Sequence, residues 1–154
     1  MDLYGELILD HAKRPHHAGL REPFDAEVHH VNPTCGDEIS LRVQLDGSGA
    51  EAVLHDVSYD ALGCSISVAS ASVLAEESTG RPVEETLETY QHLKAMLTSK
   101  GTDPGDPEQI GDGVAFAGVS RYPARVKCAL LPWTAYLDAL ARAGVDISAT
   151  STTP

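Results

Sequence analysis

Four side chains spread over most of the chain could together bind a thiophilic metal ion. Cys35 and Asp37 lie two residues apart in the N-P-T-C-G-D stretch at residues 32–37, whereas Cys64 and Cys128 are far away in the sequence. Tetrahedral zinc takes four ligands, and both Cys thiolates and Asp carboxylates serve in that role. We therefore hypothesise that these four residues meet in space and bind one ion.

Each of these residues also has an ordinary structural role. A free Cys is commonly a small buried hydrophobic residue, and an Asp that follows Gly commonly stabilises a turn. However, Cys35 lies between Pro33 and Gly36, and Cys64 follows Gly63, and neither position is typical of a core residue. These surroundings favour ligand roles, although the C-G-D spacing alone is weak support.

An antiparallel sheet is predicted around the first two of these residues. Apolar and polar residues alternate from Ile39 to Leu45, which is typical of a half-buried strand. A weaker alternation predicts a strand over residues 25–31. The turn-forming residues 46–49 are followed by a return strand predicted over residues 52–62.

The predicted hairpin indicates which residues lie at its open end. If the turn is centred near residue 48, paired positions sum to about 96, and Cys35 falls opposite about residue 61. Cys35 and Asp37 would then lie at the same end of the hairpin as Gly63 and Cys64. This inference depends only on strand pairing.

Helices are predicted on both sides of this hairpin. Apolar residues at the 3.6-residue period predict a first helix that ends at Pro15, and a closely packed helix from residue 65 to Gly80. Cys64 would lie just before the second of these helices, where the helix dipole favours a thiolate. A third helix is predicted from Pro82 to about Thr98.

The last third of the chain is harder to interpret. Lys100–Gly113 contains four Gly and two Pro, which predicts a long surface loop or a mobile insertion. Residues 114–120 could form a short helix or a covered loop. A final amphipathic helix is predicted from Pro123 to near Gly144. Because Pro132 cannot donate to the carbonyl of Cys128, that helix should begin near Cys128 or bend there.

Length and charge restrict the class of protein. With 154 residues the chain is long enough for one α+β domain, predicted over residues 1–147, with a frayed tail at residues 148–154. A formal net charge of −12 repels phosphate backbones and anionic lipid, so neither nucleic acid nor a membrane is an expected partner. The first residues lack a basic leader, which predicts a cytoplasmic protein. Three Cys do not form a secreted disulfide framework.

The seven His residues offer other metal ligands. His29 and His30 are neighbours on a predicted strand and should point to opposite faces, so they should not share an ion. We interpret these two, and His16 with His17, as solvent or packing residues. His11, in the first helix, is likewise interpreted as a packing or surface residue. No serine hydrolase elbow, phosphate loop or dinucleotide motif is present.

Three motifs in order give the chain a resemblance to a known family. N-P-T-C-G-D at residues 32–37, L-G-C-S-I-S-V-A-S-A-S at 62–72 and R-V-K-C-A-L-L-P-W at 125–133 resemble the NifU-like N-terminal family of iron-sulfur assembly proteins. The resemblance covers nearly the whole chain. It implies the SufE/NifU-like α+β fold, a three-stranded antiparallel sheet covered by helices, and a zinc site made of Cys35, Asp37, Cys64 and Cys128.

Within that family the chain resembles the SufU branch more than the IscU scaffold branch. Scaffold proteins carry His immediately before the third Cys, where this chain has Lys127, and they lack most of the segment around residues 82–113. The resemblance implies that the protein accepts persulfide sulfur from a SufS-type cysteine desulfurase and passes it to a downstream iron-sulfur assembly scaffold. Cys35 would be the acceptor thiol, and Arg125 matches an Arg that the family places beside the site.

The predicted function is therefore zinc-dependent sulfur transfer, in which a ligand from the desulfurase, such as His, replaces Cys35 on the metal and frees it to attack the persulfide. Two alternatives stay open. The same ligands could hold a [2Fe-2S] cluster in an IscU-type scaffold, or the zinc site could be purely structural.

Overall fold

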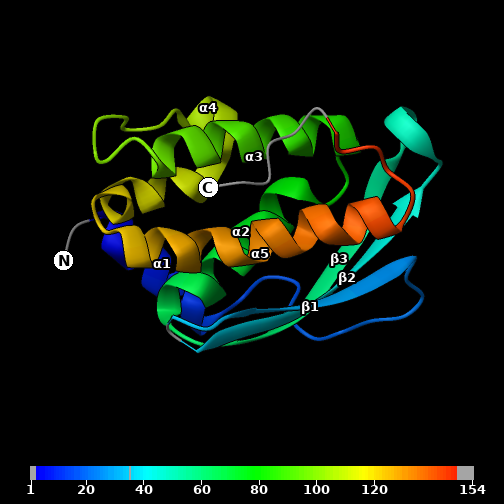
Figure 1. Cartoon of the computed structure of the whole chain (residues 1–154), viewed down its shortest axis with the longest axis horizontal. Coiled ribbons are helices and arrows are strands. Elements are labelled where there is room, and N and C mark those ends of the chain that lie inside the picture. Colours follow the sequence, from blue (N-terminus) through cyan, green and yellow to red (C-terminus); the bar gives the residue numbers. More distant parts are fainter. Residues whose placement is uncertain (1–2, 35, 149–154) are drawn as a thin grey trace.

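The computed structural model describes residues 3–34 and 36–148 (Figure 1). In chain order its elements are α1 (Leu3–Lys13), β1 (Ala26–Asn32), β2 (Asp37–Asp46), η1 (Gly49–Glu51), β3 (Val53–Leu62), α2 (Ser65–Ser78), α3 (Val83–Leu97), α4 (Pro107–Ile110), η2 (Gly111–Arg121) and α5 (Pro123–Arg142). The predicted tail at residues 148–154 falls almost entirely outside the described residues. None of the helices in the described part is long and apolar enough to cross a membrane.

The three strands form one antiparallel sheet in the order β1-β2-β3, as predicted. The predicted register of the β2–β3 hairpin is wrong by several residues, because Glu38 pairs with Leu62 and Leu45 pairs with Leu54. The connection contains the 3-10 turn η1, and an irregularity between Gln44 and Leu45 shifts the pairing further, so the turn is centred later than residue 48. Asp37 nevertheless lies at the open end of the hairpin, beside Gly63 and Cys64.

One face of the sheet forms the floor of the hydrophobic core. The alternation in β2 is confirmed, because Asp37, Ile39, Leu41 and Val43 are buried and the residues between them are only partly so. Helices α2 and α5 cover this face, and α3 and α4 lie on the side of them away from the sheet (Figure 1). The chain therefore has the predicted α+β architecture.

Helix α2 is the most enclosed element, because it packs against α1, α5 and β3. Its middle, residues 69–72, consists of Ala and Ser residues that are completely buried. Small side chains allow neighbouring backbones to approach closely, and the Ser70 hydroxyl donates to the carbonyl of Ala129 in α5 at 2.5 Å. The close packing predicted for this helix is thus confirmed, and it fixes α2 relative to α5.

The segment from residue 100 to 121 is more ordered than its composition predicts. Its second half forms the short helix α4 and the 3-10 helix η2 instead of a surface loop. Ile110 and Phe116 are 2% and 1% exposed, so both belong to the core. These apolar side chains anchor a Gly-rich segment that would otherwise be a loop.

Helix α5 begins at Pro123, so Cys128 lies in its second turn and not at its start. Pro132 is inside the helix and is buried. Because proline has no N–H, the carbonyl of Cys128 receives no hydrogen bond from position 132. The predicted helix start close to Cys128 is wrong, because the helix begins at Pro123. The other predicted alternative, a local irregularity, lies at Pro132.

Candidate metal centre

Asp37, Cys64 and Cys128 come together at one end of the sheet. Each offers one ligand atom, and the three atoms lie within 4.8 Å of one another. Asp37 and Cys128 are buried, and Cys64 is partly exposed. These residues come from the start of β2, the start of α2 and the second turn of α5, so three separate elements build the group.

Cys64 is the N-cap residue of α2, as predicted. Its backbone N–H donates to Oδ1 of Asp37 at 2.8 Å, and its Sγ lies 3.7 Å from Oδ2 of the same carboxylate. One carboxylate oxygen is thus held by the backbone while the other faces the thiol. The positive end of the helix dipole favours negative charge on both groups.

Gly63 makes this arrangement possible because it has no side chain. It adopts φ +152°, and a Cβ built on it would overlap the carboxylate of Asp37. Asp37 is only 1% exposed, so its side chain has little room to move aside. The glycine in the L-G-C motif is therefore required for the position of the carboxylate.

Asn32 is a residue of this site that the sequence analysis did not single out. It is the last residue of β1, pairs with Asp37 in the sheet, and is buried. Its Nδ2 donates to Sγ of Cys128 at 3.8 Å, and its Oδ1 accepts the backbone N–H of Thr34 at 3.2 Å. An N–H donor stabilises a thiolate more than a thiol, so Asn32 favours the ligating form of Cys128. The signal in the sequence that could have identified Asn32 is its place as the first residue of the N-P-T-C-G-D motif.

The three residues fit a thiophilic metal ion. Two ligands of tetrahedral zinc, one sulfur and one oxygen, are expected about 3.5 Å apart from their usual bond lengths. The 3.7 Å between Sγ of Cys64 and Oδ2 of Asp37 is close to that separation. The donor set of two thiols and one carboxylate also suits zinc, and a fourth ligand would complete the tetrahedron.

The other two predicted site residues are placed differently. Cys35 lies outside the described residues, and its neighbours Thr34 and Gly36 each donate a backbone N–H to Asn32. Arg125 lies one turn before Cys128 on α5 and is exposed. It lines a surface pocket of about 520 Å³ with Tyr4, Ile8 and Tyr122.

A hydrogen bond joins the strand that carries Asn32 to the helix that carries Cys128. Nε2 of His30 lies 2.8 Å from Oδ2 of Asp138. Burial alone would raise the pKa of Asp138, but hydrogen bonds from His30 and Arg142 hold this pKa below its ordinary value. His29 instead contacts Ser40 at 2.9 Å, so the two neighbours point to opposite faces, as predicted.

The fold and this site define an α+β protein with a Cys and Asp centre at the open end of a β-hairpin. The model of the NifU-like N terminal domain family matches residues 3–129. The chain therefore belongs to the NifU-like N-terminal domain family.

Two curated relatives match over most of their length. The chain is 38% identical over 141 residues to the zinc-dependent sulfurtransferase SufU of Bacillus subtilis, covering 91% of this chain and 90% of the relative. It is 36% identical over 140 residues to the iron-sulfur cluster assembly scaffold protein IscU of Streptococcus pyogenes, covering 91% and 84%. The chain is thus about equally similar in sequence to two relatives whose names state different functions.

A solved structure shares the fold. The crystal structure of an iron-sulfur cluster assembly scaffold protein for the SUF system from Fervidobacterium islandicum superposes with a TM-score of 0.78 at 33% identity. The match covers 88% of this chain and 94% of the other. The predicted SufE/NifU-like fold is therefore confirmed, together with the predicted family.

Proposed function

We propose that the protein is a zinc-dependent sulfurtransferase of iron-sulfur cluster assembly, which accepts persulfide sulfur from a SufS-type cysteine desulfurase. The observation that carries the proposal is the convergence of Asp37, Cys64 and Cys128 within 4.8 Å. The similarity to the B. subtilis zinc-dependent sulfurtransferase supports it.

Zinc would be held by Asp37, Cys64 and Cys128, with Cys35 as the fourth ligand. The ion supplies a positive charge that keeps coordinated thiols as thiolates near neutral pH. Three thiolates and one carboxylate carry more negative charge than one Zn²⁺ neutralises, so the centre is electron-rich. Such a centre would release one thiolate at modest cost, and the proposal assigns that role to Cys35.

Cys35 is the acceptor in this proposal. The free Cys35 thiolate attacks the outer sulfur of the desulfurase persulfide, and the sulfur–sulfur bond of that persulfide breaks. The electron pair leaves with the desulfurase Cys as a thiolate, while Cys35 becomes the new persulfide. Arg125, one turn from Cys128 and exposed, would steady negative charge at this rim. The sulfur then passes to a downstream iron-sulfur assembly scaffold in the cytoplasm.

The surface around the centre suits a protein partner. Val31 and Leu62 are 51% and 62% exposed and both pair with Glu38 in the sheet, one row from Asp37. Exposed apolar side chains next to a functional centre are typical of an interaction surface. Lys127, which lines a surface pocket together with Val31, adds an exposed cation there.

An IscU-type scaffold holding a [2Fe-2S] cluster is the second candidate, because the S. pyogenes scaffold protein is nearly as similar. Cys ligands suit iron-sulfur clusters as well as zinc. Lys127 favours sulfur transfer over this alternative, because an exposed ammonium group is not a metal ligand.

Single-turnover labelling tests the proposal. Zinc-loaded protein is mixed with a SufS-type desulfurase and radiolabelled cysteine, and transferred sulfur is located after alkylation and digestion. We expect one persulfide on Cys35 in the unmodified protein and none in Cys35→Ser. His92→Gln, on the exposed side of α3, should be labelled normally and serves as the control.

Other results would replace the proposal. Equal labelling of Cys35→Ser would exclude Cys35 as the acceptor. The IscU-type scaffold would be supported if the protein showed no sulfur labelling but formed a coloured cluster under anaerobic conditions that persists in the presence of zinc. A purely structural zinc site would instead lose its fold in Asp37→Ala.

Asn32→Ala is expected to weaken zinc binding by about 10- to 100-fold, which is the usual effect of removing a hydrogen bond to a metal ligand. The variant removes the donor to Sγ of Cys128. Competition with a chromophoric chelator measures the affinity. Asn32→Asp keeps an acceptor for Thr34 but not the donor, so it should weaken binding at least as much, whereas His29→Gln on the same strand should bind normally. Unchanged affinity in both Asn32 variants would contradict the role given to this residue.

A further inference from the structure

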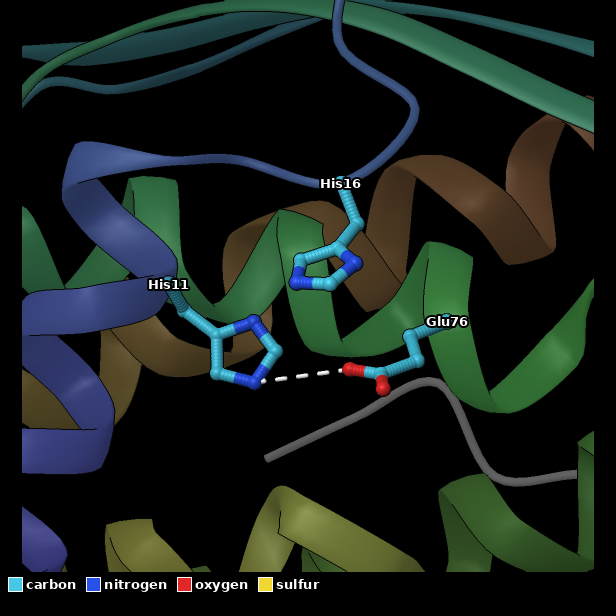
Figure 2. Close-up of side chains that lie close together, drawn as sticks. All are labelled: His11, His16 and Glu76. Atoms are coloured by element: carbon cyan, nitrogen blue, oxygen red, sulfur yellow. Dashed lines mark ion pairs between the residues drawn. The ribbon is translucent and has the colours of Figure 1, made fainter.

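A second group of potential metal ligands lies away from the candidate centre. His11 comes from the last turns of α1, His16 from the loop after it, and Glu76 from the last turn of α2. Figure 2 shows both imidazole rings and the Glu76 carboxylate facing a common space between these segments. Each residue offers one ligand atom, and the three atoms lie within 4.8 Å of one another.

The separations fit one small cation. Nε2 of His11 lies 3.5 Å from Oε2 of Glu76, which is longer than a strong hydrogen bond. Two ligands of one tetrahedral zinc ion are expected about 3.4 Å apart. The His11 and His16 ring centroids lie 5.0 Å apart with the rings tilted by 43°, so the rings are not stacked. One ion could therefore reach all three groups.

The His11 ring is held in place by a buried hydroxyl. Nδ1 of His11 lies 2.7 Å from Oγ of Ser72, which also accepts the backbone N–H of His16 at 2.8 Å. The Tyr59 hydroxyl donates to the carbonyl of His16 at 2.6 Å. The same phenol is hydrogen-bonded to Ser72, although burial is the main reason that its pKa rises to about 12.

The two ring nitrogens of His11 have different partners. With a cation at Nε2, Nδ1–H would donate to Oγ of Ser72, whereas without one Nε2 carries the proton that it shares with Oδ2 of Asp112 at 2.8 Å. Nε2 is the atom that faces Glu76. Metal-binding His residues usually donate their other ring N–H to a fixed acceptor in this way. His11 is 2% exposed, so the arrangement is built into the core.

Asp112 adds a further carboxylate to the group. Its Oδ2 lies 2.8 Å from Nε2 of His11, and its backbone N–H donates to Oε1 of Glu77 at 3.2 Å. The carboxylates of Glu76 and Asp112 therefore both lie near Nε2 of His11. A protonated His11 would pair with Asp112 and Glu76 but would gain nothing from the ring of His16, whereas a metal ion would use both imidazoles and the Glu76 carboxylate.

We propose that His11, His16 and Glu76 form a second site for a borderline divalent cation such as Zn²⁺. Imidazole and carboxylate ligands suit this class of metal. The site contains no sulfur and does not depend on the function proposed for Cys35, Asp37, Cys64 and Cys128. An ion here would join α1 and the following loop to α2.

Zinc stoichiometry tests this proposal directly. Metal-free full-length protein is titrated with Zn²⁺ alone, followed by gel filtration and metal analysis. We expect two equivalents in the unmodified chain and one in His16→Gln and Glu76→Gln, whose binding at this site should weaken by at least about 100-fold. Both replaced side chains are exposed, so the fold should survive. His92→Gln removes an exposed His elsewhere and should keep two equivalents.

Cobalt distinguishes the two sites. A thiolate-to-cobalt charge-transfer band reports the Cys ligands, so it should be unchanged in His16→Gln, and Asp37→Ala should retain the sulfur-free equivalent. A second equivalent that persists in both His16→Gln and Glu76→Gln would overturn the proposal as adventitious binding. Two other results together would overturn the proposal and identify an ion pair of protonated His11 instead. The unmodified chain would bind a single equivalent of zinc, and Asp112→Asn would be less stable at every zinc concentration.

Discussion

Alanine in place of Gly63 is expected to abolish metal binding at the candidate centre while most of the fold remains. A Cβ at this position would overlap Oδ1 of Asp37 and lie 2.7 Å from its Cγ. The buried carboxylate would have to rotate away, which would also break its hydrogen bond from the Cys64 N–H. Because a proposed ligand is itself displaced, zinc affinity should fall by more than the roughly 10- to 100-fold typical of changes to residues that only contact a ligand.

Metal analysis after gel filtration, together with circular dichroism, would measure both parts of this prediction. Gly80→Ala is a matched control, because Gly80 has φ +85° and nothing within 4 Å of an added Cβ. It should cost only about 1 kcal/mol of stability from backbone strain and should keep the metal. Normal zinc content in Gly63→Ala would show that the carboxylate is not a ligand.

Trp133→Ala is expected to lower the free energy of unfolding by about 3–5 kcal/mol, because it leaves a large cavity in the core. Trp133 is 1% exposed, and its ring packs against Tyr90 with centroids 6.3 Å apart. It lies on α5, the helix that also carries Cys128. The midpoint of thermal unfolding should fall by on the order of 10 °C.

Trp133→Phe separates packing from hydrogen bonding at the same position. Within the described part of the chain, Nε1 of Trp133 has no hydrogen-bond partner. Phenylalanine therefore loses volume but no hydrogen bond, and we expect it to cost less than half as much as alanine in denaturant unfolding. Equal losses in the two variants would indicate that the indole N–H makes an important bond.

The sequence alone was sufficient to predict the elements in which apolar or small residues follow a clear pattern. The alternation from Ile39 to Leu45 predicts β2 because one face of the sheet is buried, and Gly63 before a small-residue run predicts Cys64 at the N-cap of α2. Antiparallel pairing predicts that Asp37 and Cys64 meet, and the structure places them together. Metal binding by these residues stays a prediction.

Other features depend on contacts that no local pattern contains. The order of the Gly-rich segment comes from burial of Ile110 under α3, and the hairpin register depends on the η1 turn. His11 and His16 were interpreted as packing or solvent residues, because nothing in the sequence places either of them beside Glu76. Their proximity arises only when α1 packs on α2.

The position of Cys128 on α5, the last helix of the described chain, bears on when the proposed zinc ion could bind. During synthesis, β2 and the start of α2 leave the ribosome well before α5 does. A nascent chain would thus expose only some of the proposed ligands, which would bind zinc weakly. The full set of ligands would exist only once α5 has docked. If zinc binds here as proposed, loading would be a late step in maturation, after α5 has docked.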